Sequence, residues 1–265
     1  MQKQNTHSLL IAYTEAGDVG AVKRLLQQVD DKNLLNGTKR NDTSTWPVHV
    51  AVSRGDESGR QILRELLNRG ADVHGAFTNG GAFTNGDGDN HPETPLIDAL
   101  SNGDHETASL LLAHGADPND TTMSGDTVLV HLCRHWVAIK NLSLAESEKL
   151  VELLLHHGAD PDGWWEDNKP REMPLPEAYD LGSTKIVKML LSAGASWYDD
   201  DEDGINTDGD TPLHVAARDG KVEMAKIFFK HNRRLIIKKN KKKETPLGIA
   251  LSRNDDNMLK MFSRM

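Results

Sequence analysis

The stretch Asp210-Thr211-Pro212-Leu213-His214-Val215-Ala216-Ala217 decides the fold, because shortened copies of it recur along the chain. The clearest copies are Glu93-Thr94-Pro95-Leu96-Ile97-Asp98-Ala99, Glu244-Thr245-Pro246-Leu247-Gly248-Ile249-Ala250 and Trp46-Pro47-Val48-His49-Val50-Ala51, and weaker ones begin at Thr127 and Met173. A second string recurs between them, at Gly70-Ala71-Asp72, Gly115-Ala116-Asp117, Gly158-Ala159-Asp160 and Gly194-Ala195-Ser196. The interval between the two strings is 16 residues in three cases, Ala99 to Gly115, Ala178 to Gly194 and Ala216 to Asn232. The chain is therefore built from repeats.

Both strings have a helical interpretation. A proline in the first helical turn costs no backbone hydrogen bond, and the threonine before it can cap the exposed amides. A glycine after the second helix, such as Gly115 or Gly158, takes the left-handed conformation that ends a helix. The stretches before these glycines, such as Leu110-Leu111-Leu112, have an apolar spacing that suits burial between flanking repeats. The two strings together predict one helix pair per repeat.

The paired strings resemble the ankyrin repeat, a unit of about 33 residues with a β-turn, two helices and a Thr-Pro-Leu-His signature. The resemblance implies an all-α solenoid of about seven helix-turn-helix units with short β-hairpin loops, forming one array over residues 1–265. It implies that His49 and His214 tie neighbouring turns by hydrogen bonds. The first pair, around Leu9 to Leu26, is expected to be an N-terminal cap, and the last pair to have a polar outer face. The approximate repeats are residues 5–40, 45–75, 93–120, 126–163, 172–200, 210–240 and 244–265.

Three insertions interrupt the regular spacing, at residues 76–92, 137–143 and 197–208. Insertions in repeat proteins fall on loops and often on the binding face. The first contains a duplicated Ala-Phe-Thr-Asn-Gly string. It is interpreted either as a flexible loop or as a finger that places Phe77 and Phe83 against a partner.

The second insertion lies between the two helices of its repeat. Trp136 stands where a turn glycine is expected, so the first helix is expected to run on to about Ile139. Ser143 with Glu146 three residues later predicts a capping box that opens the second helix.

The third insertion holds five consecutive acidic residues, Asp199-Asp200-Asp201-Glu202-Asp203. Asp199, Asp201, Asp203 and Gly204 match the opening of a calcium-binding EF-hand loop. The twelfth position is Asp210 rather than glutamate, and the flanking EF-hand helices are absent. An acidic contact patch and a solvated tip are the favoured alternatives, and calcium binding stays open.

Four aromatic residues fall in two successive hairpin segments. Trp164 and Trp165 precede Glu166 and Asp167, and Trp197 and Tyr198 precede the acidic run. Large aromatic side chains beside acids on a projecting element are typical of interface anchors. The tryptophan at 197 holds a place usually taken by a small residue packed between hairpins, so we expect it to be at least half structural.

The charge is unevenly spread. The net charge of −9 comes from 31 basic and 40 acidic residues, and seven of the basic ones lie between Arg233 and Lys243 with no acid among them. Removing these seven charges leaves −16 on the rest of the chain. Such a balance disfavours general nucleic-acid binding and favours a partner with a basic surface patch. For the basic segment, a solvated tip is favoured over a nuclear-import or nucleic-acid site.

Several other classes lack the residues they need. No apolar run approaches the ~20 residues of a membrane span, and the apolar start Leu9–Tyr13 is too short for a signal-peptide core. Cys133 is the only cysteine, which favours a reducing, cytoplasmic location. His131 and His135 could seat a metal on one helix face, but no further ligand is near in sequence. We therefore expect no catalytic residue, cofactor or metal.

The favoured function is a non-catalytic protein-binding module that is monomeric on its own. An inhibitor or immunity protein for a basic enzyme and a secreted bacterial effector that engages a host protein are two specific versions. An ankyrin scaffold of an enzyme and a nucleic-acid binder are the alternatives, although no stretch is left over for a catalytic core. The resemblance implies contacts from the concave face, namely Glu93, Ser101, Asn102, Asp126, Arg134, His135, Glu172, Asp180, Asp210, Arg218 and Asp219. The hairpin tips add Trp164, Trp165, Glu166, Asp167, Trp197, Tyr198, Asp199, Asp200, Asp201 and Asp203.

Overall fold

The chain forms two compact units, Met1–Ala159 and Asp160–Met265. The computed structural model describes residues 2–28, 35–36, 46–74, 83–85, 89–91, 94–122, 125–134, 142–163, 173–197 and 208–264. Both units are built from helix pairs, which confirms the all-α repeat fold.

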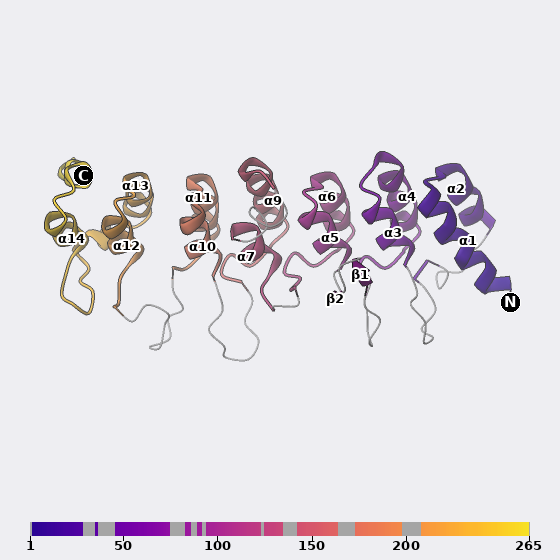
Figure 1. Cartoon of the computed structure of the whole chain (residues 1–265), viewed down its shortest axis with the longest axis horizontal. Coiled ribbons are helices and arrows are strands. Elements are labelled where there is room, and N and C mark those ends of the chain that lie inside the picture. Colours follow the sequence, from indigo (N-terminus) through magenta and orange to yellow (C-terminus); the bar gives the residue numbers. More distant parts are fainter. Residues whose placement is uncertain are drawn as a thin grey trace. The chain divides into compact units, whose positions relative to one another are not determined.

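In the first unit, the two helices of each pair pack on each other. The pairs are α1 (Gln2–Ala16) with α2 (Val19–Gln28), α3 (Pro47–Ser53) with α4 (Glu57–Asn68), α5 (Pro95–Ser101) with α6 (His105–Ala113), and α7 (Val128–Cys133) with α9 (Leu144–His156). The first helices α1, α3 and α5 contact one another in turn, and so do the second helices α2 and α4. Within this unit the first helices form one row and the second helices another (Figure 1).

The second unit repeats this arrangement. Its pairs are α10 (Pro174–Leu181) with α11 (Thr184–Ala193), α12 (Pro212–Asp219) with α13 (Val222–His231), and α14 (Pro246–Ser252) with α15 (Asp256–Ser263). The 3₁₀ turn η2 (Arg233–Ile237) joins α13 to the last pair. The first helix α12 contacts α14, and the second helix α13 contacts both α11 and α15. Each pair is thus held by its neighbours, as stacked repeats require.

The signature residues act as their positions predict. The hydroxyl of Thr94 accepts a hydrogen bond from Ile97 N at 3.3 Å, and the hydroxyl of Thr245 accepts one from Gly248 N at 3.1 Å. Each threonine therefore caps the helix that its proline opens. Thr127, in the copy without proline, makes no such bond to α7.

First and second helices both contribute to the core, the second helices slightly more. Leu66, Leu111, Leu154 and Leu190 occupy successive second helices, and all four are fully buried. Burying one such side chain contributes about 2 kcal/mol to the free energy of unfolding. The helices end where the glycines predict, since Gly115 has a φ of 94° and Gly194 a φ of 98°.

Asn232 departs from this rule. It stands where the other repeats have glycine, and its φ of −142° is extended. Its side chain then accepts a hydrogen bond from Arg234 N at 3.1 Å and opens η2. The segment that connects α13 to the last repeat therefore has a different backbone conformation from the connections that begin at a left-handed glycine.

Two expectations about the insertions are settled in the described residues. The capping box is confirmed, because Glu146 N donates to Ser143 Oγ at 3.2 Å and Ser143 N donates to Glu146 Oε2 at 2.7 Å. The expectation that the preceding helix runs on to about Ile139 is wrong for α7, which ends at Cys133. Residues 135–141 lie outside the described part of the chain.

The first insertion contains a short β-hairpin. Strand β1 (Phe83–Asn85) pairs antiparallel with β2 (Asp89–His91), with Phe83 opposite His91. The second copy of the duplicated string thus enters a strand. The first copy, with Phe77, lies outside the described residues, and the choice between a loop and a contact finger stays a prediction.

Candidate protein interface

Turns that precede successive first helices are joined by side chains. In the first unit, Thr94 Oγ1 donates to Asp120 Oδ2 at 2.7 Å, and Val128 N donates to the backbone oxygen of Asp120 at 3.0 Å. In the second unit, Ser196 Oγ donates to Asp162 Oδ2 at 3.3 Å. Each unit therefore holds neighbouring turns in register through polar residues.

The strongest of these links joins the turns before α12 and α14. Asp210, which is 2% exposed, accepts hydrogen bonds from Arg218 Nη1 and from Asn240 Nδ2, the latter at 2.8 Å. Burial raises the pKa of Asp210, but the hydrogen bonds from Arg218 and Asn240 outweigh it, so the pKa lies below its ordinary value. Asp210 is thus ionised and held inside the fold, where it orders the turn instead of facing a partner.

His214 adds a second link between the same turns. Its Nδ1 accepts from Thr211 N at 3.1 Å, and its Nε2 lies 3.0 Å from the backbone oxygen of Glu244. The first bond fixes Nε2 as the protonated nitrogen, so Nε2 donates to that oxygen. The prediction that His214 ties neighbouring turns is confirmed. His49, at the same place in α3, is 5% exposed.

The basic segment is anchored by a buried asparagine. Asn240 is 5% exposed, and its Oδ1 accepts from Glu244 N at 2.9 Å. Its neighbours Lys241, Lys242 and Lys243 are exposed. Lys242 Nζ lies 2.8 Å from Asp208 Oδ2, and this pairing raises the pKa of Lys242. The solvated tip that the sequence favoured is therefore a fixed turn that presents its lysines in a defined arrangement.

An aromatic cluster joins α10 to α13. The ring of Trp197 lies 5.4 Å from that of Tyr179 and 5.2 Å from that of Phe228, edge-on in both cases. Such edge-on pairs stabilise by about 1 kcal/mol beyond the area they bury. Trp197 is half-buried. It therefore packs inside the second unit, and its part in binding a partner stays a prediction.

Tyr179 connects this cluster to the charged surface. Its hydroxyl donates to Asp219 Oδ2 at 2.7 Å, and Lys221 Nζ lies 3.9 Å above its ring and donates to its backbone oxygen at 3.0 Å. Burial raises the pKa of Tyr179 strongly, and the Asp219 carboxylate raises it further. The tyrosine thus stays protonated and fixes Asp219 at the end of α12.

The remaining predicted residues of the second unit lie at the carboxyl ends of first helices. Asp180, near the end of α10, is exposed, and so is Asp219 at the end of α12. Arg218 is half-buried, and its pair with Asp210 raises its pKa. Asp180 and Asp219 are therefore on the surface, while Arg218 is paired with the buried Asp210.

In the first unit, the predicted residues that the structure describes lie at the end of α5 and beside α7. Asp126 is half-buried, with Oδ2 3.9 Å from His131 Nε2, and that nitrogen is also 2.7 Å from Thr122 Oγ1. Arg134 caps the end of α7 and is half-buried. Ser101 is 2% exposed, which removes it from the surface.

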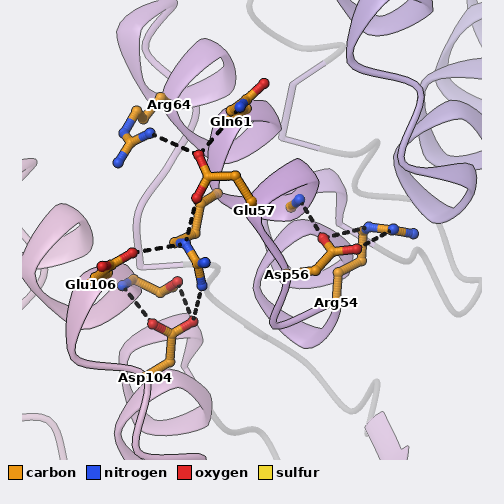
Figure 2. A network of polar contacts seen from close by, with 10 residues as sticks. Arg54, Asp56, Glu57, Gln61, Arg64, Asp104 and Glu106 are labelled. Atoms are coloured by element: carbon orange, nitrogen blue, oxygen red, sulfur yellow. Dashed lines mark hydrogen bonds and ion pairs between the residues drawn. The ribbon is translucent and has the colours of Figure 1, made fainter.

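A separate ion-pair network lies between α4 and α6 of the first unit (Figure 2). Arg60 Nε contacts Glu57 Oε2 at 3.2 Å and Glu106 Oε2 at 3.1 Å, and its Nη1 contacts Asp104 Oδ2 at 3.4 Å. Asp104 is also the cap of α6, accepting from Thr107 N at 3.0 Å. One guanidinium thus lies among three carboxylates, and the network links the second helices α4 and α6 of adjacent repeats.

Some predicted contacts cannot be placed. The residues outside the described part of the chain are Glu93, His135, Trp164, Trp165, Glu166, Asp167, Glu172, Tyr198, Asp199, Asp200, Asp201 and Asp203. The acidic hairpin and its calcium alternative therefore stay predictions.

Other residues that shape this surface were not predicted from the sequence. Asn240 sits in a lysine-rich string that suggested only solvent exposure, and Lys221 has no motif of its own. Tyr179 carried a signal, because a large residue there replaces the small second alanine of the motif, as Ala217 shows.

The described residues contain no group of three or more His, Cys, Asp or Glu side chains that could hold a metal ion. None of their helices is long and apolar enough to cross a membrane.

The chain is similar to proteins from animals, viruses and bacteria. It is 28% identical over 208 residues to the nuclear factor NF-kappa-B p105 subunit of Gallus gallus, which covers 78% of this chain and 18% of the relative. It is 32% identical over 133 residues to the putative ankyrin repeat protein FPV014 of fowlpox virus, covering 49% of this chain and 26% of the relative. It is 25% identical over 206 residues to the phosphocholine transferase AnkX of Legionella pneumophila, covering 76% and 18%.

The chain thus spans between 18% and 26% of the length of these relatives. A family model described as ankyrin repeats in three copies matches residues 76–163 and 175–264, which is more than half of the chain. Together with the stacked helix pairs, the capped Thr-Pro-Leu motifs and the histidine link between turns, this match shows that the chain belongs to the ankyrin-repeat family.

Proposed function

We propose that this chain is a non-catalytic module that binds a partner protein through the turns and the carboxyl ends of its first helices, and that the partner presents a basic patch. Ankyrin repeats mediate protein–protein interactions and are generally non-catalytic. The finer claims concern the surface used and the charge of the partner.

The observation that carries the proposal is the buried link between Asp210 and Asn240. It fixes two successive turns before any partner arrives, so little conformational entropy remains to be lost at these positions on binding. Two exposed acids are then held in place, because Asp219 accepts a hydrogen bond from Tyr179 and Asp180 lies in the last turn of α10. Acidic groups at the rim of such a surface steer and orient a basic partner.

The most specific version is an inhibitor that covers a basic enzyme surface. The net charge of −16 outside the basic segment supports this version. A protein with so many acidic residues attracts a basic partner over a longer range than single contacts do. The second version is a bacterial effector that engages a host protein. The similarity to AnkX favours it, although AnkX is named for an activity of a much longer protein.

The test uses a matched pair of charge reversals in the second unit. Asp180→Lys changes the proposed surface, and Lys188→Glu changes another exposed residue, on the second helix α11. The tagged chain and both variants are used to recover partners from the source cells, and each recovered protein is then titrated in purified form. We expect Asp180→Lys to weaken binding about tenfold and to reduce its salt dependence, while Lys188→Glu binds like the wild type. Equal binding by all three proteins would refute the proposed surface.

A further inference from the structure

The second helices of the second unit, α11, α13 and α15, carry a lysine at the same repeat position. In each helix this lysine is exposed and stands midway between two residues that are four positions apart and at most 7% exposed. At 3.6 residues per turn, the midway residue lies on the opposite side of the helix from that buried pair. The sets are Ile186, Lys188 and Leu190 in α11, Met224, Lys226 and Phe228 in α13, and Met258, Lys260 and Phe262 in α15. The three lysines therefore lie on the outer sides of their helices.

These lysines form one row, because the helices that carry them are stacked. Helix α13 contacts both α11 and α15. Packed helices have axes about 8–10 Å apart, so the row extends over roughly 20 Å. Lys230 and Arg264 lie one turn beyond Lys226 and Lys260 on the same side, and both are exposed. They widen the row into a basic strip, which consists of Lys188, Lys226, Lys230, Lys260 and Arg264.

The acids on this side lie at the opposite ends of the helices. Glu223 and Asp256 are in the first turns of α13 and α15, and both are exposed. Glu223 Oε1 accepts a hydrogen bond from Lys226 Nζ at 2.6 Å. At the carboxyl end of α13 the charge is positive, since Arg233 and Arg234 follow that helix and are exposed. The strip therefore continues into further basic residues on the side away from its two acids.

The surrounding segment is basic as a whole. Residues 220–264 carry 13 basic and four acidic side chains, a net charge of +9 in a chain whose total is −9. The two acids outside the second helices are engaged locally. Glu244 Oε2 accepts from Asn240 Nδ2 at 3.2 Å, and Asp255 caps α15 by accepting from Met258 N at 3.0 Å. Little negative charge is thus left to neutralise the strip.

The same repeat position in the first unit carries no such row. The midway residues of α4, α6 and α9 are Arg64, Ser109 and Glu152. A solvent-facing helix side needs polar residues, but it does not need charges of one sign. Like charges one turn apart, such as those of Lys226 and Lys230, repel each other and destabilise a helix. The fold therefore gives no reason for the strip, and a ligand with negative charge would.

We propose that the basic strip binds the phosphate backbone of a nucleic-acid duplex without sequence preference. Interfaces with nucleic acid are polar and strongly positive, and contacts from lysine to phosphate supply affinity without reading bases. Single strands are bound with the help of aromatic side chains on which bases stack, and the strip has none. The chain's total charge disfavours binding at most of its surface, so the contact is confined to this one.

The strip is less suited to a protein or a membrane. Interfaces between proteins are depleted in lysine and have an apolar centre, and stable membrane binding adds an apolar group to the basic patch. In the part of the second unit that the structure describes, the exposed large apolar residues are Ile237, Leu247 and Leu251, and all lie outside α11, α13 and α15. This inference does not rest on the function proposed above, which concerns first helices and acidic residues.

The probes are a short labelled DNA duplex and an RNA duplex of the same sequence, each titrated against the full chain by fluorescence anisotropy at several salt concentrations. We expect saturable binding that weakens as salt is raised from about 50 to 200 mM. The strip variant combines Lys188→Gln, Lys226→Gln and Lys260→Gln. It should bind tenfold or more weakly at low salt, and its slope of log K against log salt should be shallower by about 3, since each phosphate contact contributes about 0.9. The duplex that binds more tightly identifies the natural form.

The matched control removes the same charge from the turn before α14 in the same unit. It combines Lys239→Gln, Lys241→Gln and Lys243→Gln, which replace three exposed lysines outside the strip. The control should keep the wild-type slope within about 1. Circular dichroism checks that both variants keep their helix content.

The proposal is overturned by any of three results. The first is the lack of saturable binding of either duplex at about 50 mM salt. The second is an unchanged slope in the strip variant together with a reduced slope in the control, which would place the contact at the turn. The third is strip-dependent binding of phosphatidylserine vesicles or of a polyglutamate peptide that is tighter than binding of both duplexes, because the occupant would then be a membrane or an acidic protein.

Discussion

The side-chain amide of Asn240 donates a hydrogen bond of 2.8 Å to the carboxylate of Asp210, which lies 30 residues earlier in the chain. Both residues are at most 5% exposed. The bond joins the turns before α12 and α14, so the order of one turn depends on the other. A partner that binds at either turn therefore contacts a surface whose conformation depends on both turns.

Replacing Asn240 by alanine tests the strength of this link. The variant leaves Asp210 with one fewer donor in a buried place, and we expect the free energy of unfolding to fall by about 2–3 kcal/mol. Urea denaturation followed by circular dichroism measures the change. Asn257→Ala is the control, since Asn257 is exposed on α15, and it should stay within about 0.5 kcal/mol of the wild type. A similar loss in both variants would contradict the role given to Asn240.

Asp120 gives a pH-dependent test in the first unit. Burial raises the pKa of Asp120, although the bond from Thr94 lowers it in part. The native chain therefore binds its proton more tightly than the unfolded chain, and this residue's contribution to stability falls as pH rises above about 4.

Asp120→Asn removes the charge and keeps an oxygen that can accept from Thr94. We expect the variant to gain stability relative to the wild type as pH is raised from about 3.5 to 7, as measured by urea unfolding at each pH. Exposed Asp180→Asn serves as the control. A relative gain that grows toward low pH would show that the sign of the Asp120 shift is wrong.

Tyr179→Phe removes one hydroxyl from a buried ring. The lost bond to Asp219 should cost about 1–2 kcal/mol in thermal or urea unfolding. Because the pKa of Tyr179 is raised, its phenol should stay protonated near pH 10, where an exposed tyrosine ionises. Of the three tyrosines in the chain, fewer than three should therefore titrate at 295 nm while the fold persists, and the variant should give the same absorbance change. Loss of a normal titration step in the variant would contradict the buried bond.

Trp197→Ala separates packing from partner contact. Its ring fills space against Tyr179 and Phe228, so we expect a loss of about 2–4 kcal/mol, with a smaller loss for Trp197→Phe. Denaturation monitored by far-ultraviolet circular dichroism avoids relying on the removed fluorophore. An unchanged midpoint in Trp197→Ala would assign the residue to binding alone.

The sequence predicted the parts of the fold that depend on short-range pattern. A threonine before a proline caps a helix within three residues, as Thr245 does, and a glycine after a helix sets its end, as Gly115 does. His214 could be assigned because the repeat unit places its partner turn at a known interval. Such features need only local geometry and the period of the repeat.

The sequence could not predict contacts that depend on one repeat's departures from the motif. Asn240 lies among lysines, and its partner Asp210 lies 30 residues away, so no local pattern couples them. The end of α7 at Cys133 also departs from the longer helix that the missing turn glycine suggested.

The most direct test of the central claim is hydrogen–deuterium exchange of the chain with and without its purified partner. The account predicts that binding slows exchange at the turns and first helices, in residues 173–182 and 208–221, and leaves the second helices α11 and α13 unchanged. Protection confined to α11 and α13 would contradict it.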